Sequence, residues 1–120
     1  MLIADDNIDD RDLYAMFLGL HGYRVANAHN SQQAIDQVFG RRPAAIVMDV
    51  TIPGMDGWTA CRLLKDDSRT ANISIIMLTA HAQEETAAHA KAAGCNAYLV
   101  KPCLPENLLA EIKRQLLRSV

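Results

Sequence analysis

Residues 46–58 read IVMDVTIPGMDGW, an apolar run that stops at a carboxylate and continues into a turn. Ile46, Val47 and Met48 are typical of a buried strand, and Asp49 is the residue at which that strand ends. The proline and glycines that follow are typical of turns. Burying an unpaired carboxylate costs several kcal/mol or forces its protonation. Asp49 therefore needs a partner or a chemical task, and the rest of the chain supplies candidates for both.

Composition indicates one globular domain that spans residues 1–120. Half of the residues are hydrophobic and 22% are charged, which is not the composition of a disordered chain. A chain of this length can bury about two-thirds of its surface. The net charge is −2 and aromatic residues make up only 5%, so the chain offers neither a basic surface nor a stacking platform. We therefore expect no direct nucleic-acid binding.

Cysteine usage and hydropathy bear on localisation. Cys61, Cys95 and Cys103 lack the spacing of metal ligands, and their odd number does not suit a disulfide framework. Reduced thiols in a cytosol are the plain interpretation. No stretch reaches the ~18 apolar residues of a membrane span, and Asp5 and Asp6 interrupt any N-terminal signal peptide. We expect a cytoplasmic protein with no membrane partner.

Short apolar runs alternate with longer segments of helical period along the whole chain. This alternation predicts an α/β fold, a parallel sheet with helices on both sides. The run at 73–78 is almost wholly apolar, as expected for a strand buried on both faces. The expected strands are 2–4, 23–28, 44–48, 73–78 and 96–100, and the expected helices are 9–21, one from a cap at Asn30 or Ser31 to Gly40, 58–65, 83–93, and one that begins at Pro105.

Two of the expected helices have an apolar face. In the first, Gly22 is placed to end the helix, and the last has Pro105 in its first turn. Apolar residues at helical spacing predict which side of each helix packs on the sheet. The residues are Leu13, Met16, Phe17 and Leu20 in the first helix and Leu108, Leu109, Ile112 and Leu116 in the last.

Polar side chains stand where four of the five expected strands end. Asp5 and Asp6 follow the first strand, Asp49 the third, Thr79 the fourth and Lys101 the fifth. In a parallel sheet these ends meet at one edge, where functional groups gather near a topological switch point. Three carboxylates placed together repel one another unless a cation joins them. A hard divalent ion with oxygen ligands, most naturally Mg²⁺, would remove that repulsion.

The same edge is suited to phosphoryl transfer. Mg²⁺ held by few carboxylates keeps positions that can accept phosphate oxygens. A carboxylate beside the ion can attack phosphorus and form an acyl phosphate. Thr79 could then donate a hydrogen bond to a phosphoryl oxygen, and Lys101 could neutralise its charge. Asp49 thus has a partner and a task, as the candidate nucleophile.

Four segments carry a resemblance to the receiver domain of bacterial two-component response regulators, over essentially the whole chain. They are ADDN at 4–7, MDVTIPGMDG at 48–57, LTA at 78–80 and AYLVKP at 97–102. Each segment is weak alone, whereas all four, in order and at the right strand ends, are specific. The resemblance implies a flavodoxin-like, doubly wound sheet of five parallel strands in the order 2-1-3-4-5, with five flanking helices.

The resemblance also implies a role for each acid. Asp49 would be the phosphoacceptor, taking phosphate from a phosphohistidine. Asp6 and Asp49 would bind the cofactor Mg²⁺ directly, and Asp5 would act largely through water. The backbone carbonyl of Thr51 would complete the metal site.

The remaining strand-end residues would contact or respond to the phosphoryl group. Thr79 and Lys101 would bind it, and Tyr98 would change position on activation, together with the face made by the fourth helix, fifth strand and fifth helix. The Lys101–Pro102 bond is usually cis in this family. Thr51 and His81 occupy positions that vary within it and tune how fast the phosphate is lost.

The implied partners follow from phosphorelay signalling. The phosphoryl group would come from a sensor histidine kinase or a histidine phosphotransfer protein. The signal would go to a downstream protein or to an output domain outside this sequence, or into a dimer formed on phosphorylation. The domain would be no enzyme in the usual sense, because it would catalyse only its own phosphorylation and dephosphorylation. It could be a stand-alone regulator or part of a larger protein such as a hybrid kinase.

Plainer interpretations exist for several of these residues. Asp5 and Asp6 fit a turn or a helix cap, and Asp56 with Gly57 fits a turn that leads into the third helix. Tyr98 could simply pack. The acids gain a chemical interpretation because a hydroxyl and a lysine end neighbouring strands.

Three other functions compete with a phosphoacceptor domain. A phosphatase of the haloacid dehalogenase type also uses a strand-end aspartate, but it has a second acid where this chain has Thr51. A dinucleotide-binding domain needs glycine in the first strand–helix turn, and residues 4–11 contain none. A pseudo-receiver, an interaction module that is never phosphorylated, usually lacks an acid, the hydroxyl or the lysine. None is missing here, and the pseudo-receiver remains the alternative.

Overall fold

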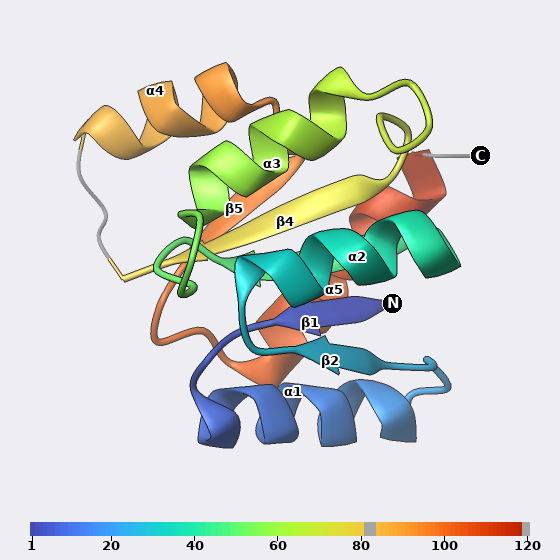
Figure 1. The fold of residues 1–120 in the computed structure, drawn as a ribbon. Helices are drawn as coiled ribbons and strands as arrows, with labels where there is room; N and C mark the ends of the chain where they lie inside the picture. Colours follow the sequence, from blue (N-terminus) through green and yellow to red (C-terminus); the bar gives the residue numbers. More distant parts are fainter. Residues whose placement is uncertain (81–83, 119–120) are drawn as a thin grey trace.

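The computed structural model describes residues 1–80 and 84–118, which form a parallel five-stranded sheet between two layers of helices (Figure 1). The strand order is β2-β1-β3-β4-β5, which confirms the expected flavodoxin-like arrangement. Strands and helices alternate along the chain. The elements are β1 (Leu2–Ala4), α1 (Ile8–Leu20), β2 (Ala26–Ala28), α2 (Ser31–Arg41), β3 (Ala45–Asp49), α3 (Gly57–Asp66), β4 (Ser74–Thr79), α4 (Glu84–Ala93), β5 (Ala97–Val100) and α5 (Pro105–Arg118).

The sheet has an apolar core on each face, because successive side chains of a strand point to opposite sides. Ile46 and Met48 lie in one core, which α2, α3 and the end of α4 cover. Val47 and Ile76 lie in the other core, which α1 and α5 cover. The strands β1, β3 and β4 are buried along their whole length. This burial explains why they appear in the sequence as apolar runs without alternation.

The first three helices begin at side chains that accept backbone N–H groups. Asn7 caps α1 by accepting the N–H of Asp10 at 3.1 Å, and Asn30 and Asp56 cap α2 and α3 in the same way. Such caps satisfy donors that a helix leaves unpaired at its start. After α1 the chain turns at Gly22, whose φ of +91° lies in the region that favours glycine. The sequence predicted the cap at Asn30 and the stop at Gly22, whereas for α1 it offered Asp5 and Asp6 as possible caps and not Asn7.

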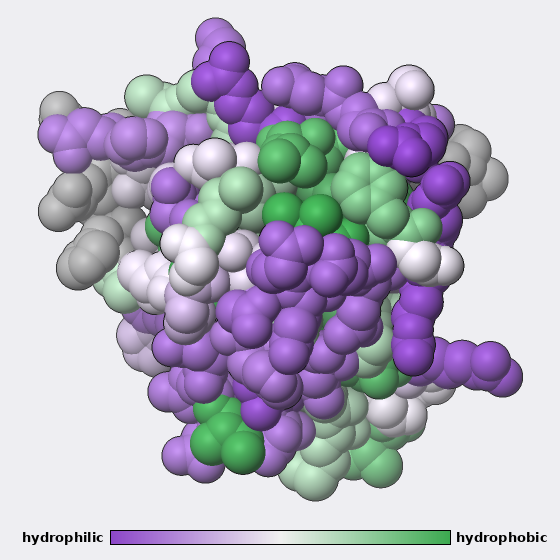
Figure 2. Space-filling model, viewed as in Figure 1, coloured by the Kyte–Doolittle hydropathy of each residue, from purple (hydrophilic) through white to green (hydrophobic). Residues whose placement is uncertain are grey.

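The expected buried face of α1 is mostly wrong, because only Phe17 of its four residues packs against the core. Leu13, Met16 and Leu20 are 45%, 62% and 78% exposed, whereas Tyr14 and Leu18 are buried. The helix is apolar on more than one side, so its periodicity did not decide which side meets the sheet. A polar contact fixes the choice, because the Tyr14 hydroxyl donates to the backbone carbonyl of Cys103 at 2.8 Å. Figure 2 accordingly shows hydrophobic groups at the lower edge of the view, where α1 lies in Figure 1.

Other boundaries differ from expectation by a few residues. The strand expected at 23–28 is regular only over Ala26–Ala28, at the edge of the sheet. The helix expected to stop at Gly40 continues to Arg41 and ends at Arg42, which adopts a left-handed conformation. Gln83, the expected start of the fourth helix, lies outside the described residues. The expected face of α5 is confirmed, since Leu108, Leu109 and Ile112 are buried and Leu116 packs beside them. No described helix is long and apolar enough to cross a membrane.

Gly57→Ala should lower the free energy of unfolding by about 1–3 kcal/mol, because an added methyl group would overpack the start of α3. A Cβ at this position would lie 2.6 Å from the carbonyl oxygen of Asp49 and 2.8 Å from both the Cα of Val50 and the Cε of Met77. Urea unfolding curves measure the change.

Gly19→Ala is the matched control, since a Cβ there would meet nothing within 4 Å. Alanine should be neutral or stabilising at this helical position. Equal effects of the two substitutions would show that the contact between α3 and the end of β3 is not tight.

Candidate functional site

The carboxyl ends of the strands bring four of the candidate residues to one edge of the sheet. Asp5 follows β1, Asp49 is the last residue of β3, Thr79 is the last residue of β4 and Lys101 follows β5. Parallel pairing aligns these ends, with Asp49 opposite Leu78 and Thr79 opposite Val100. The backbone N–H of Lys101 also donates to the carbonyl of Thr79 at 2.7 Å.

The ammonium group of Lys101 is the centre of this edge. Its Nζ lies 2.5 Å from Asp49 Oδ2, 3.0 Å from Asp5 Oδ2 and 3.2 Å from Asp10 Oδ2. The side chain of Lys101 is 19% exposed, and those of Asp5 and Asp49 are almost fully buried. Burial alone would lower the pKa of Lys101, but hydrogen bonds from its ammonium to Asp49 and Asp5 and the charges of these carboxylates raise it. Lys101 therefore stays cationic at any physiological pH.

Asp49 is held as an anion. Its Oδ1 accepts two hydrogen bonds of 2.8 Å, from the backbone N–H and the hydroxyl of Thr51, and its Oδ2 accepts from Lys101. Burial acts to raise the pKa of Asp49, but these hydrogen bonds and the charge of Lys101 outweigh it and place the pKa below its ordinary value. The ionised form is the nucleophilic form of a carboxylate.

Asp5 is pushed in the opposite direction. It is 1% exposed, and this burial is the main reason why its pKa is raised, with a further contribution from the negative charge of Asp49. Hydrogen bonds from the backbone N–H of Asn7, at 2.9 Å, and from Lys101 offset the rise only in part. The site therefore contains two neighbouring carboxylates with different proton affinities, an arrangement frequent at functional sites.

The other residues implicated by the sequence differ in how far they are buried. Asp6 and Thr51 are exposed, Thr79 is buried, and Tyr98 is 37% exposed on β5, the edge strand. The Lys101–Pro102 bond is cis, as the family resemblance implied. His81 lies outside the described residues. Asp56 caps α3, in agreement with its structural interpretation.

The donor set suits a hard cation. Asp5, Asp6 and Asp49 offer carboxylate oxygens, and Thr51 offers a backbone carbonyl, which are ligands that Mg²⁺ prefers. Within residues 1–80 and 84–118, however, no three histidine, cysteine or acidic side chains are already arranged as a metal site. In this arrangement Lys101 is the cation that holds Asp5 and Asp49 together.

Asp10 is the site residue that the sequence analysis missed. It lies in the first turn of α1, and its carboxylate contacts Lys101. Attention to strand ends alone could not find it. The local sequence signal for Asp10 was Asn7. A helix cap at Asn7 places Asp10 in the first turn of α1, directly after the end of β1. Nearby, Arg11 Nη1 donates to the backbone carbonyl of Asp5 at 2.9 Å.

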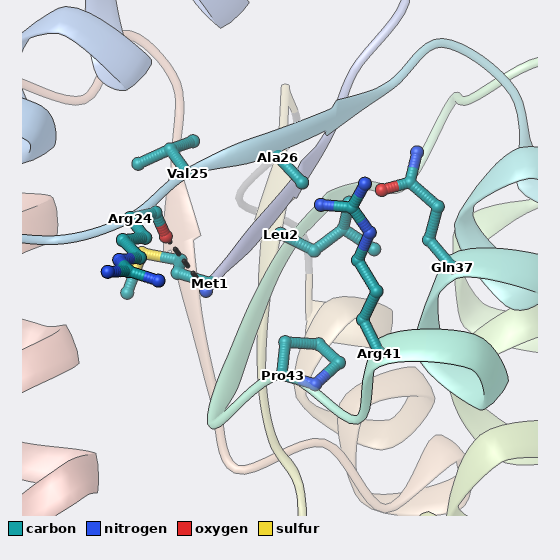
Figure 3. Close-up of a pocket in the computed structure, with 8 residues that line it drawn as sticks. All are labelled: Met1, Leu2, Arg24, Val25, Ala26, Gln37, Arg41 and Pro43. Carbon is teal, nitrogen blue, oxygen red and sulfur yellow. Dashed lines mark hydrogen bonds between the residues drawn. The ribbon is translucent and has the colours of Figure 1, made fainter.

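Two hollows in the surface help to locate the chemistry. One, of about 160 Å³, lies at the other end of the strands, where β1 and β2 begin (Figure 3). Its lining includes Arg24 and Arg41 but no carboxylate, and Figure 3 shows the two guanidinium groups apart from each other. The other, of about 470 Å³, is lined by residues that include Asp10 and Lys101. The second hollow is the one that opens beside the acidic edge.

Comparison with known proteins agrees with this geometry. The family model described as "Response regulator receiver domain" matches residues 1–113. The chain is 37% identical over 119 residues to the phosphate regulon transcriptional regulatory protein PhoB of Pseudomonas aeruginosa, covering 99% of this chain and 52% of PhoB. It is 35% identical over 125 residues to the DNA-binding dual master transcriptional regulator RpaA of Synechocystis, covering 99% of this chain and 49% of RpaA. The chain thus spans about half the length of these curated relatives.

A solved structure supports the same grouping. The chemotaxis response regulator CheY4 of Vibrio cholerae superposes with a TM-score of 0.89 and 32% sequence identity, covering 95% of each chain. The two chains therefore share the fold along almost their whole length.

The expectation that the protein makes no direct contact with nucleic acid is wrong. RpaA is named as DNA-binding and PhoB as a transcriptional regulatory protein. The expectation rested on the charge and aromatic content of this chain, which matches only about half of each relative. The composition of one half cannot exclude a function that belongs to the whole protein.

Asp5→Asn and Asp49→Asn should change the free energy of unfolding in opposite directions at about pH 7 in buffer that contains a chelator. The pKa of Asp5 is raised on folding, so its contribution to stability is present below the unfolded pKa and lost as the pH rises through the folded pKa. Asparagine imitates the neutral form and should stabilise. The pKa of Asp49 is lowered, so its contribution is present above the unfolded pKa and lost as the pH falls through the folded pKa. Its neutralisation should destabilise.

Urea unfolding at about pH 7 and about pH 4 measures both effects. The effect of Asp5→Asn should shrink at the lower pH because wild-type Asp5, whose pKa is raised, becomes protonated there. Most of the effect of Asp49→Asn should persist, because the lowered pKa of Asp49 keeps this carboxylate ionised in the folded protein. Changes of the same sign for the two variants would show that Lys101 and Thr51 do not distinguish the two acids.

Proposed function

This chain belongs to the family of response regulator receiver domains, and we propose that it accepts a phosphoryl group on Asp49 from the phosphohistidine of a sensor histidine kinase or a histidine phosphotransfer protein. The observation that carries the proposal is the state of Asp49. Its carboxylate is buried at the end of β3, yet Lys101 and Thr51 keep its pKa low. A nucleophile that is ionised, fixed in direction and paired with a cation is what phosphoryl transfer to a carboxylate requires.

The transfer would proceed in one displacement. An oxygen of Asp49 would form a bond to phosphorus while the bond between phosphorus and the histidine nitrogen breaks, leaving an acyl phosphate and an imidazole. Lys101 would then neutralise charge on the phosphoryl oxygens, and its position beside Asp49 supports this role. Thr79 would donate its hydroxyl, because it ends the strand next to β3. Hydrolysis of the acyl phosphate by water would reset the domain.

Mg²⁺ is the cofactor that fits the donor set. We propose that Asp5, Asp6 and Asp49, with the backbone carbonyl of Thr51, would hold it. When bound, Mg²⁺ would stabilise negative charge on the transferring group. The chemistry of the donors supports this assignment, since carboxylate and carbonyl oxygens are the ligands that Mg²⁺ prefers.

As a whole, the domain would serve as a signalling module. Receiver domains are signalling modules rather than conventional enzymes, and this one would catalyse only its own phosphorylation and dephosphorylation. The domain would occupy residues 1–120, since α5 runs to Arg118 and packs on the sheet. Its place would be the cytoplasm, and its free cysteines fit a reducing compartment. The pseudo-receiver alternative has no support, because the acids, the hydroxyl and the lysine are all present.

Phosphorylation would be transmitted through β4 and β5. Thr79 is buried at the end of β4, and Tyr98, opposite Met77 on the neighbouring strand, is 37% exposed. Movement of Thr79 toward a phosphoryl group would vacate space beside β5, and Tyr98 is the bulky side chain able to fill it. The face of α4, β5 and α5 would change with it. Most residues of α4 are small, EETAAHAKAA, so few large side chains anchor that helix.

Incubation with Mg²⁺ and acetyl phosphate should add one phosphoryl group, visible by intact-mass spectrometry and labile to hydroxylamine. Asp49→Ala should abolish the addition, and so should a chelator. Asp56→Ala is the matched control, because Asp56 is exposed near the same loop but caps α3 and does not contact Lys101. It should be phosphorylated as the wild type is. Unchanged addition in Asp49→Ala would overturn the proposed function.

Beryllofluoride, a mimic of the phosphoryl group, should shift backbone amide resonances of residues 84–104 as well as those near Asp49. In Thr79→Ala, phosphorylation should persist while the shifts in residues 84–104 become much smaller. Two-dimensional amide spectra with and without the mimic provide the test. Shifts confined to the loops around Asp49 in the wild type would refute the switch and leave the phosphoacceptor role intact.

A further inference from the structure

The third partner of Lys101 has no role in the proposed phosphoryl transfer. An ammonium group has three N–H donors, and three carboxylates surround that of Lys101. Two of them, Asp5 and Asp49, belong to the strand-end site. The third, Asp10, comes from the first turn of α1. The donor capacity of Lys101 is therefore already filled before any phosphoryl group arrives.

A phosphoryl oxygen that binds Lys101 before Asp49 has reacted must displace one of these carboxylates. The side chains of Asp5 and Asp49 are 1% and 7% exposed, whereas that of Asp10 is 39% exposed and lies farthest from Nζ, at 3.2 Å. Water can solvate an Asp10 carboxylate that leaves, but it cannot reach the other two in the same way. Asp10 is consequently the partner that is lost most easily.

From this geometry we propose that Asp10 is a positioning residue that competes with the phosphoryl group for Lys101 and thereby limits how fast Asp49 is phosphorylated. The inference rests on the proposed function, since it assumes that Asp49 is the phosphoacceptor. Asp10 holds the Lys101 ammonium toward α1 and gives it up when the transferring group takes its place.

The negative charge of Asp10 should also slow the phosphorylation of Asp49. The hollow of about 470 Å³ beside the site is lined by Asp10 and Lys101, so an anionic phosphodonor that approaches from this side meets a negative charge. Removing that charge should favour the approach, and the effect of charge on the approach should weaken as salt is added. Loss of competition for Lys101 is a contact effect that salt screens less. The two contributions can therefore be separated by ionic strength.

Asp10→Asn removes the charge and weakens the hold on Lys101. Its rate of phosphorylation by acetyl phosphate with saturating Mg²⁺, followed by intact-mass spectrometry, should exceed that of the wild type roughly three- to tenfold. The increase should appear in the maximal rate and persist at high salt. Asp9→Asn is the matched control, since Asp9 lies in the same first turn and is exposed to solvent, but it is not one of the carboxylates that contact Lys101. Its maximal rate should stay within about twofold of the wild type.

A double-mutant cycle separates positioning from a general effect of helix α1 on the fold. In a Lys101→Met background, Asp10→Asn should no longer raise the rate, because the group it competes for is absent. An equal increase in Asp9→Asn, an increase that persists without Lys101, or no increase in Asp10→Asn while the wild type is phosphorylated would each overturn the inference. If wild-type Asp49 took no phosphate at all, the proposed function itself would fail, which is a distinguishable result.

Discussion

One ammonium group, that of Lys101, makes it possible to bury two carboxylates side by side at the end of a parallel sheet. Asp5 and Asp49 are almost wholly removed from water, and two unpaired anions in such a place would cost more than a small domain can tolerate. Hydrogen bonds from Lys101 to both acids offset that cost. The two acids nevertheless differ in pKa, because Thr51 donates two further hydrogen bonds to Asp49 and none to Asp5. The result is a fixed, ionised nucleophile beside an acid with a raised pKa.

The parallel sheet is what brings this cluster together. Parallel strands end at the same edge, so residues 5, 49, 79 and 101, distant in sequence, come together without any loop having to carry them. Cores on both faces of the sheet hold β1, β3 and β4 rigidly. The edge strand β5 is less buried and bears Tyr98 at the surface. Buried strands thus hold the acids, while the neighbouring strand β5 and helix α4 are less firmly anchored. This arrangement suits the conversion of a local change in charge into a change of the protein surface.

Much of this was predictable from the sequence, and the exceptions have physical causes. The buried strands and their terminal polar residues were identifiable because hydrophobic runs and strand ends are local features. The buried side of α1 was not identifiable, since that helix is apolar on several sides. The hydrogen bond from Tyr14 to Cys103 that favours the observed side joins residues far apart in the chain. Asp10 was missed for a related reason, because its importance depends on Lys101, which is brought to it only by the sheet. Nucleic-acid binding was misjudged because the chain matches only about half of each relative.

The pKa values of Asp5 and Asp49 show whether Lys101 pairs with both acids and leaves them unequal. Carboxyl ¹³C shifts of selectively labelled protein, followed against pH in metal-free buffer, would give both values in the wild type and in Lys101→Met. We expect a pKa for Asp5 above the ordinary aspartate value and a pKa for Asp49 below it. We also expect the pKa of Asp49 to rise when Lys101 is replaced. Equal pKa values for the two acids, or a pKa of Asp49 that does not respond to the loss of Lys101, would show that Lys101 does not control the cluster.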